Sequence, residues 1–217
     1  MPNSNIKIIP AEWALQVPSV TAFCTTRAGG VSEGDFASLN LSDHVQDNPQ
    51  AVAKNRQLLK QQLALPAEPD WLKQTHSIDV IDLDRSASRE GDAAYCSSPG
   101  RIAVVMTAEC LPVLFCNISG SEVAAAHAGW RGLANGILEQ TVAAMDSENE
   151  QIMAWLGPAI GPAKFEVGSE VRARFIEQDA ETASCFSQNR PGHYLADLYS
   201  LARIRLYKAG VTLISVG

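Results

Sequence analysis

Short apolar runs bounded by turn residues alternate with amphipathic stretches along the whole chain. Short runs rich in β-branched and aromatic residues are typical of buried strands, whereas apolar positions spaced by three and four predict helices. Strands are predicted at Val20–Thr26, Trp71–Gln74, Ile78–Leu83, Ile102–Met106, Val113–Cys116, Val123–Ala126, Ile152–Leu156 and Val211–Val216. No repeat or shift in composition divides the chain, so we predict a single α/β domain over residues 1–217, with a mixed β-sheet core flanked by helices.

Capping residues mark the ends of the predicted helices. Asn48 before Pro49 begins a helix that runs to about Leu65, because Asn caps free amides and proline suits the first helical turn. Further helices are predicted over residues 132–145, 169–178 and 195–208. Asp197 in the first turn of the last helix and Lys208 in its last turn complement the helix dipole.

Composition and charge narrow the class of protein. The net charge of −7 argues against a nucleic-acid partner and an anionic membrane surface, and no apolar run reaches membrane-spanning length. Five cysteines without a C-x-x-C pair form a poor disulfide framework and favour free thiols in a reducing compartment. The N-terminus lacks the features of a secretory signal. We therefore predict a cytoplasmic protein that acts on a small molecule, as a monomer or a small homo-oligomer.

Three side chains that could ligate a metal interrupt the apolar runs. Cys110 follows the run at 102–106, His127 follows the run at 123–126, and His76 separates two earlier predicted strands. Their spacing matches no compact zinc finger, so the hypothesis depends on their positions at strand ends, where α/β enzymes build sites at the carboxyl edge of a sheet. Three nitrogen and sulfur ligands with one open position are typical of catalytic zinc, and a thiolate leaves zinc or copper. The alternative is a packed cysteine and two structural histidines.

Two turns join an arginine to glycines, Arg27-Ala28-Gly29-Gly30 and Gly129-Trp130-Arg131-Gly132. Glycine lets backbone amides approach a ligand closely, and the second turn begins a predicted helix whose free amides suit an anion such as phosphate. The alternative is that the glycines serve turns and the arginines are surface cations.

Glu109 is a carboxylate directly beside the thiol of Cys110. It could act as a general acid or base, it could orient one of the two histidines, or it could point to solvent. His44 and His193 lie in polar stretches and are assigned structural or solvent roles. No G-x-S-x-G motif is present, and a cysteine hydrolase built on the thiol and one imidazole would leave the other histidine without a role.

Seven motifs follow one another along the chain: Thr26–Ser32 (TRAGGVS), Ser38–Leu41 (SLNL), Gln74–His76 (QTH), Thr107–Pro112 (TAECLP), Ala126–Gly132 (AHAGWRG), Gly157–Pro162 (GPAIGP) and Phe165–Gly168 (FEVG). In this order they closely resemble the YfiH family, the bacterial laccase-domain proteins once described as polyphenol oxidases. The resemblance covers about Val20 to Gly210.

The resemblance implies both a metal site and an activity. It implies zinc bound by His76, Cys110 and His127. It also implies phosphorolysis of purine nucleosides (adenosine, inosine, guanosine and methylthioadenosine) and deamination of adenosine. Under this hypothesis the residues that bind substrate or phosphate are Arg27, Asn40, Gly129 and Arg131, and the catalytic residues are Glu109 and Arg27.

Three alternatives stay open. Members of the family have also been described as copper-dependent phenol oxidases, although four histidines are too few for the several coppers of a laccase. Others have been described as amidases that edit a peptidoglycan precursor. The third alternative is a ligand-binding module in which zinc is purely structural, which a fourth protein ligand would favour.

The sequence departs from the family pattern in two places. The usual Thr-Ala-Asp-Cys is Thr-Ala-Glu-Cys in this chain, so Glu109 reaches about 1.5 Å further than aspartate and is expected to weaken catalysis if it touches the substrate. The family also usually continues past the last strand into a segment with Cys-Thr and Tyr-Arg-Arg. This sequence ends at Gly217, so we expect a loss of activity if those arginines bind the anion.

Overall fold

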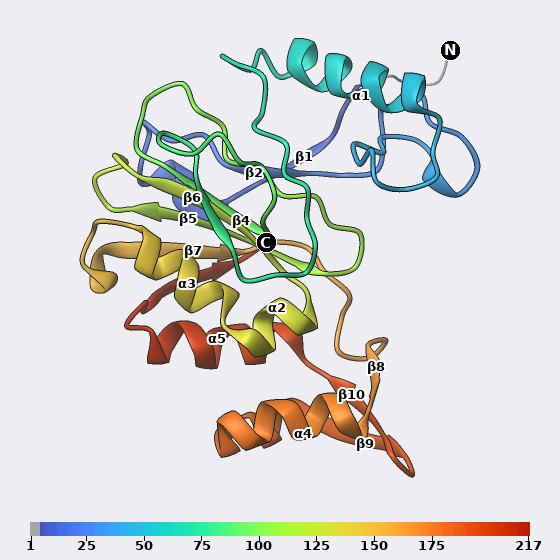
Figure 1. Cartoon of the computed structure of the whole chain (residues 1–217), viewed down its shortest axis with the longest axis vertical. Helices are drawn as coiled ribbons and strands as arrows, with labels where there is room; N and C mark the ends of the chain where they lie inside the picture. The colour runs from blue at the N-terminus through green and yellow to red at the C-terminus, as the bar shows by residue number, and fades with distance from the viewer. Residues whose placement is uncertain (1–4) are drawn as a thin grey trace.

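A six-stranded mixed sheet lies at the centre of the computed structural model, which describes residues 5–217 (Figure 1). Its strands, in spatial order, are β11 (Leu213–Val216), β7 (Ile152–Leu156), β5 (Leu111–Asn117), β6 (Val123–Ala128), β4 (Ala93–Cys96) and β3 (Val80–Asp82). The outer pairs β11–β7 and β3–β4 are parallel, and the three inner pairs are antiparallel. The predicted α/β fold with a mixed sheet is therefore confirmed.

The central strands are apolar nearly throughout because both of their faces are covered. Every residue of β7 is buried, and so is all but one residue of β5 and of β6. On one face lie α2 (Trp130–Asn135), α3 (Ile137–Ala144) and α5 (Leu198–Lys208), drawn below the sheet in Figure 1. The main hydrophobic core fills the space between these helices and the sheet.

The opposite face carries a smaller cluster built on two tryptophans. Trp13, in the 3₁₀ helix Glu12–Leu15, packs with Trp155 of β7 and Cys116 of β5. The flanking strands β1 (Ile8–Pro10) and β2 (Phe23–Thr25) pair with each other in an antiparallel arrangement. The N-terminal segment therefore closes the second face of the sheet.

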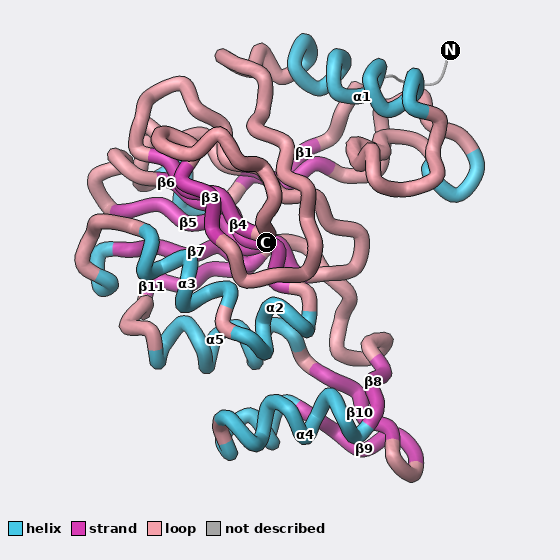
Figure 2. Tube along the Cα trace, in the orientation of Figure 1, coloured by secondary structure: helices cyan, strands magenta, loops and turns pink. Residues whose placement is uncertain are grey.

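Helix α1 (Pro49–Gln62) lies at one end of the molecule, and long loops run between it and the sheet (Figure 2). Asn48 caps the helix, since its Oδ1 accepts a hydrogen bond of 2.8 Å from the Gln50 amide, as predicted. At the other end of the molecule, α4 (Ser169–Gln178) packs on a three-stranded sheet. That sheet has the order β8 (Glu166–Gly168), β10 (His193–Ala196) and β9 (Phe186–Arg190).

Several helices and strands begin or end at other residues than predicted, and in two helices a single residue is the reason. Gly136 has φ +105° and splits the predicted helix 132–145 into α2 and α3. Asp197 is the cap of α5 rather than a residue of its first turn, because its Oδ1 accepts from the Tyr199 and Ser200 amides. The strands predicted at 20–26, 78–83 and 211–216 shrink to residues 23–25, 80–82 and 213–216.

Two predicted strands are wrong. Ile102–Met106 and Trp71–Gln74 are loops, each with one isolated bridge to another segment, because their other backbone groups bond to loops and side chains. Ala93–Cys96 form a strand of the central sheet that the sequence analysis did not predict. This strand, β4, is fully buried and lies between β6 and β3. His193, expected in a loop, lies in β10.

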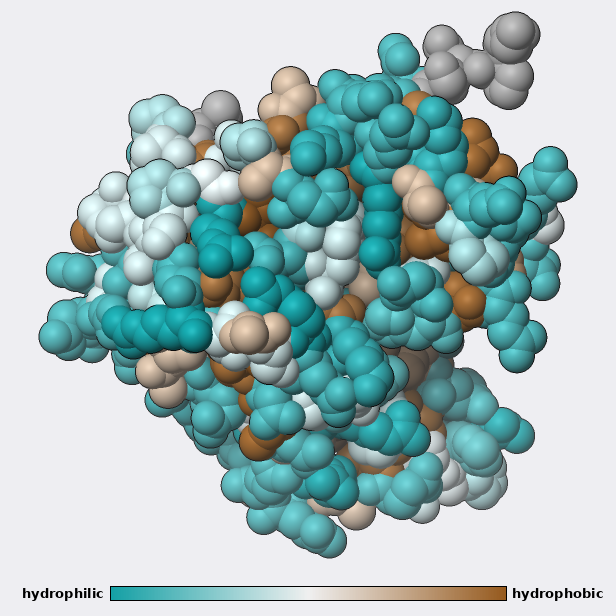
Figure 3. Space-filling view, turned by 45° about the horizontal axis from the view of Figure 1, so that its top comes forward, coloured by the Kyte–Doolittle hydropathy of each residue, from teal (hydrophilic) through white to brown (hydrophobic). Residues whose placement is uncertain are grey.

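The surface is largely hydrophilic on the face that Figure 3 shows, and its apolar patches are small and scattered. None of the helices within residues 5–217 combines the length and apolar character needed to cross a membrane.

Candidate metal centre

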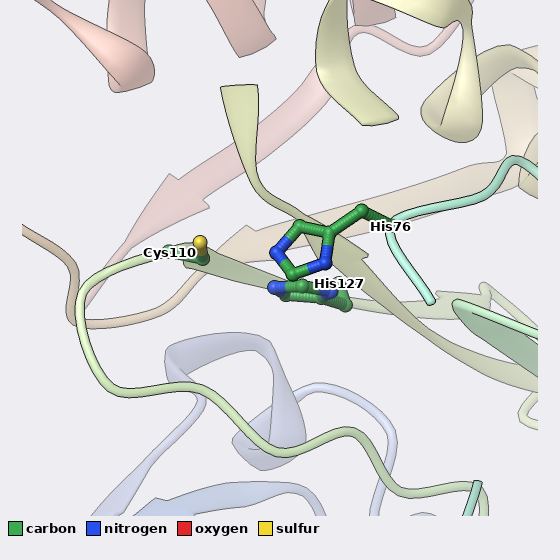
Figure 4. Close-up of side chains that lie close together, drawn as sticks. All are labelled: His76, Cys110 and His127. Atoms are coloured by element: carbon green, nitrogen blue, oxygen red, sulfur yellow. The ribbon is translucent and has the colours of Figure 1, made fainter. Parts of the chain in front are cut away.

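The structure brings together the three side chains expected to ligate a metal. One ligand atom from each of His76, Cys110 and His127 lies within 4.8 Å of the other two (Figure 4). The imidazole rings of the two histidines meet edge to face, with centroids 5.0 Å apart and an angle of 70° between their planes. His127 is buried, Cys110 is half-buried and His76 is exposed, so the cluster opens to solvent on one side.

The antiparallel pairing of β5 and β6 explains how Cys110 and His127 meet. Cys110 directly precedes β5, and His127 is the penultimate residue of β6. In the register of this pair Leu111 faces Ala128 and Pro112 faces His127. The expectation that Cys110 ends a strand is therefore wrong, because it lies at the start of one; an antiparallel neighbour brings that start to the same edge as the carboxyl end of β6.

His76 lies in a loop with a strained backbone. Its φ is +61°, in the left-handed region that costs a residue with a side chain roughly 1–2 kcal/mol. Such a conformation persists only where the surroundings fix it. Two sets of hydrogen bonds do so here, one around His76 itself and one beside it.

The first set comes from Asp92, a fully buried carboxylate just before β4. Its Oδ2 accepts from the Thr75 amide (3.0 Å), the Ser77 amide (2.7 Å) and the Ser77 hydroxyl (3.0 Å). Its Oδ1 lies 2.8 Å from Nδ1 of His127, and its backbone oxygen accepts from the His127 amide. The sequence prediction missed Asp92, because its partners lie far away in the chain and no local pattern marks it as buried.

The second set comes from the amide side chain of Gln74. Its Nε2 donates to the backbone oxygen of Met106 at 2.8 Å, and its Oε1 accepts from the Met106 amide at 2.7 Å. The pair of bonds imitates strand pairing and joins the loop of His76 to the loop that leads to Cys110.

Asp92 and His127 each stabilise the charged form of the other. Burial alone raises the pKa of Asp92, but hydrogen bonds from His127, Thr75 and Ser77 outweigh it and hold the pKa at about 2. Burial alone lowers the pKa of His127, but the bonds to Asp92 and Cys110 outweigh it and raise the pKa to about 9. A metal that binds His127 must therefore displace a proton.

The donors and the space around them fit a metal of the zinc type. A thiolate and two imidazoles are the ligands that zinc and copper prefer, and calcium and magnesium avoid. Gly129 packs directly against the cluster: a Cβ built on it would lie 2.9 Å from Sγ of Cys110 and 3.5 Å from Nε2 of His127. The close approach of the backbone thus explains the glycine at this position.

Glu109 and Arg131 flank the cluster in sequence, and the structure shows what each charged side chain contacts. Glu109 is exposed, and its backbone oxygen accepts from the Ile160 amide at 2.9 Å. Its carboxylate makes no hydrogen bond or ion pair with the described residues. Arg131 is also exposed and stacks on the ring of Trp130, with its guanidinium carbon 4.5 Å from the ring centroid.

Arg27 and Asn40 belong to a separate network of loop contacts. Nε of Arg27 donates to the backbone oxygen of Ala37 at 2.8 Å. The Asn40 amide donates to the Ser42 carbonyl and the Asp47 carboxylate and accepts from the Ser42 amide. All the hydrogen bonds of these two side chains within residues 5–217 are local, and none reaches the histidines or Cys110.

The other histidines and cysteines have structural surroundings. His44 lies against the Leu72 carbonyl, and His193 lies 3.5 Å from the Glu166 carboxylate. All five cysteines are free thiols, as predicted. Burial raises the pKa of Cys96 and Cys116 to about 11, which keeps these two thiols protonated at neutral pH.

The fold and the cluster define an α/β protein with a His–Cys–His centre, and comparison with known proteins identifies its family. Residues 21–217 match the family model described as multi-copper polyphenol oxidoreductase laccase. Purine nucleoside phosphorylase YfiH of Escherichia coli is 51% identical over 207 residues, which are 94% of this chain and 84% of that protein. A purine nucleoside phosphorylase of Haemophilus influenzae is 48% identical over 202 residues, 92% of this chain and 83% of that one.

Solved structures agree with the sequence matches. The crystal structure of a Neisseria meningitidis protein has a TM-score of 0.90 at 45% identity, over 97% of this chain and 86% of that one. The YfiH protein of Bacillus licheniformis has a TM-score of 0.85 at 30% identity, over 100% and 86% of the two chains. The chain therefore belongs to the YfiH family of laccase-domain proteins, and the resemblance carried by its seven motifs is confirmed.

Proposed function

We propose that the protein is a zinc-dependent purine nucleoside phosphorylase. The observation that carries the proposal is the convergence of His76, Cys110 and His127 on one point that opens to solvent. The names of the relatives supply the reaction, since those of E. coli and H. influenzae are called purine nucleoside phosphorylases. When bound, zinc supplies a Lewis acid beside the substrate.

The reaction joins phosphate to the sugar and releases the base. A phosphate oxygen forms a bond to the anomeric carbon of ribose while the bond from that carbon to purine N9 breaks. The electron pair goes to the base, which takes up a proton, and the products are ribose 1-phosphate and the free purine. The protein must therefore hold an anion beside the sugar and move a proton near the base.

Two arginines are suited to hold the phosphate. Arg131 has no ion pair within the described chain, so its guanidinium can accept an anion next to the cluster. Arg27 uses only Nε for the Ala37 carbonyl, which leaves its terminal nitrogens for a second contact. Gly129 lets the turn that carries Arg131 pack against the thiol of Cys110. Asn40 is less suited to bind phosphate, because both donors of its side-chain amide are already bonded, to the Ser42 carbonyl and the Asp47 carboxylate.

Glu109 is the proposed proton carrier. Its carboxylate is exposed beside Cys110 and is not bonded to other described residues. The same group serves the proposed deamination of adenosine, in which water replaces the amine at C6 of the purine and ammonia leaves. Adenosine, inosine, guanosine and methylthioadenosine are the proposed substrates of phosphorolysis.

The test is to incubate the zinc-loaded protein with adenosine, with and without phosphate, and to measure ribose 1-phosphate and inosine. We expect ribose 1-phosphate only with phosphate, inosine in both cases, and neither product from His76→Ala or Cys110→Ala. Activity unchanged in these variants would rule out the metal mechanism. Absence of ribose 1-phosphate from a protein that binds zinc would rule out phosphorolysis.

Copper-dependent phenol oxidation is the second candidate, because thiolate and imidazole also bind copper and the matching family model is described by that activity. Within residues 5–217 one group of three potential ligands lies close together, and His44 and His193 have partners elsewhere. One such group cannot hold several coppers. Phenol oxidation that rises only with added copper would show that this activity is adventitious.

The amidase alternative has a test of its own. Competition by a peptidoglycan precursor in the nucleoside assay would favour it.

A further inference from the structure

Asp92 touches both of the histidine-bearing segments of the cluster, and it is fully buried. We propose that Asp92 is the positioning residue of the metal centre: one carboxylate oxygen fixes the loop of His76, and the other fixes the orientation and tautomer of His127. The inference rests on the proposed metal site. It assigns to Asp92 the orienting role that the sequence left open for Glu109, whose carboxylate is exposed and bonds to neither histidine.

The Oδ2 side of Asp92 fixes the loop. The amides of Thr75 and Ser77, which flank His76 directly, both point to this oxygen, and the Ser77 hydroxyl adds a third donor. Two converging amides determine the path of the backbone between them. They therefore hold His76 at a φ of +61°, which a histidine would not adopt on its own.

The Oδ1 side of Asp92 fixes the ring of His127. A carboxylate only accepts hydrogen bonds, so the proton of the neutral ring must lie on Nδ1, 2.8 Å from Oδ1. The lone pair is then on Nε2, the nitrogen that lies with Cys110 Sγ beside Gly129. A carboxylate behind a ligating histidine also raises the basicity of the ring and commonly changes metal affinity roughly ten- to a hundredfold.

Substitution by asparagine separates the two functions because the amide group has one acceptor and one donor. In Asp92→Asn the acceptor oxygen must face the three donors of Thr75 and Ser77, since the opposite orientation would point NH₂ at two backbone amides. The new NH₂ group would then face Nδ1 of His127, which must accept, and the ring proton moves to Nε2. The substitution therefore keeps the loop and blocks the ligand atom.

Asp84 provides a matched control. Its Oδ2 accepts from the Ser97 amide (2.7 Å), the Ser98 amide (3.0 Å) and the Ser97 hydroxyl (3.2 Å), the same pattern of donors as at Asp92. No histidine bonds to Asp84 among the described residues; its Oδ1 lies 3.7 Å from Nε of Arg101 instead. Asp84→Asn therefore removes a charge from an equivalent loop contact and should leave the metal site unchanged.

The experiment measures zinc affinity of the full chain by competition with a chromophoric chelator, together with thermal melting of the metal-free protein and the absorption spectrum of the cobalt-substituted protein. We expect Asp92→Asn to bind zinc roughly ten- to a hundredfold more weakly than wild type. We expect it to melt within a few degrees of Asp84→Asn and to show weakened cobalt d–d bands while the thiolate charge-transfer band persists. Asp84→Asn should bind zinc within about threefold of wild type.

Each other outcome has a defined meaning. Wild-type zinc affinity in Asp92→Asn would overturn the positioning role, and so would an Asp92→Asn protein that does not fold, because the role would then be structural alone. Equal losses of affinity in Asp92→Asn and Asp84→Asn would show an effect of net charge and would also overturn it. Failure of the wild-type protein to bind zinc would instead overturn the proposed metal site on which the inference rests.

Discussion

The two glycine-containing turns look alike in sequence and differ in what their glycines do. In the first turn the amides of Gly29 and Gly30 both donate to the Ser38 hydroxyl, and a Cβ on Gly30 would lie 2.2 Å from the Ser38 carbonyl and 2.5 Å from the Asn55 amide oxygen. In the second turn Gly129 has no such internal bonds to a side chain and packs against the thiol of Cys110. One turn uses glycine to close a loop, and the other uses it to make room for the metal cluster.

The difference shows that an arginine beside glycines does not by itself indicate an anion site. The amides of the Gly29–Gly30 turn are bonded within the protein, so they are not available to phosphate. The Gly129 turn lies over three ligand side chains, and the guanidinium of its neighbour Arg131 stacks on Trp130 and makes no ion pair with the described residues. The surroundings of the turn, rather than its motif, decide its function.

The largest predicted effect comes from adding one methyl group to each turn. Gly129→Ala should lower zinc affinity about a thousandfold, or about 4 kcal/mol, because the thiol must rotate away from the new Cβ, while the melting temperature changes little. Gly30→Ala should destabilise the fold by about 2–3 kcal/mol, since the atoms in its way include backbone, and should leave zinc affinity unchanged. Chelator competition and urea unfolding measure the two quantities. Equal effects of both variants on zinc affinity would remove the distinction between the turns.

The free energy of unfolding of the metal-free protein is expected to depend on pH, because Asp92 and His127 form a buried, hydrogen-bonded pair. The pKa of His127 is raised from 6.5 to about 9, so its contribution is complete below pH 6.5 and is lost as pH rises through 9. The pKa of Asp92 is lowered from 3.8 to about 2, so its contribution is complete above pH 3.8 and is lost as pH falls through 2. We expect a loss of about 2–3 kcal/mol between about pH 6 and pH 10.

The measurement is urea unfolding at the two pH values with a chelator present. Asp92→Asn serves as the control, because other groups that titrate at alkaline pH are the same in both proteins. A decline of the same size in Asp92→Asn would show that the pair is not its cause.

Removal of each arginine should give a smaller effect. Arg131→Ala is expected to raise the KM for phosphate about tenfold, equivalent to about 1.4 kcal/mol, because an exposed guanidinium that makes no ion pair with the described residues is lost. Arg27→Ala should raise it only about threefold, because part of its guanidinium is already bonded to Ala37. Initial rates at varied phosphate measure both values, and a larger effect of Arg27→Ala would reverse the proposed order of the two turns.

The smallest predicted effect is at Glu109, beside Cys110. Glu109→Asp restores the shorter carboxylate of the family pattern and should raise kcat roughly two- to threefold without changing zinc affinity, if the extra reach misplaces the proton carrier by about 1.5 Å. Glu109→Ala is the paired variant and should lower kcat. An unchanged kcat in both variants would exclude Glu109 from the chemistry.

The strands β5, β6 and β7 were predictable from the sequence because burial makes them continuously apolar, whereas the equally buried β4 was missed. The pattern located Ile152–Leu156 to the residue, and the cores of β5 and β6. It missed β9, whose five residues include four exposed ones, because a polar edge strand lacks the signal. It also mistook the half-buried run 102–106 for a strand, since side-chain contacts with Gln74 took the place of strand pairing.

The three proposed metal ligands were predictable from their residue types, whereas Asp92, which bonds to the segments that carry the two histidines, was not. A thiol and two imidazoles are rare enough near apolar runs to be noticed one by one. Asp92 depends on long-range contacts: it meets His127, 35 positions away, and the two amides that flank His76. Nothing in the local pattern states which aspartate will be fully buried. The cytoplasmic location, the single domain and the oligomeric state stay predictions.

Metal content tests the central claim most directly. The protein should be purified without added metal, and its zinc and copper should be counted per chain for wild type and for Cys110→Ala. We predict about one zinc per chain in wild type, little copper, and almost no zinc in the variant, since the thiolate is one of three ligands. Wild-type protein without stoichiometric metal, or a Cys110→Ala protein with as much zinc as wild type, would contradict the account.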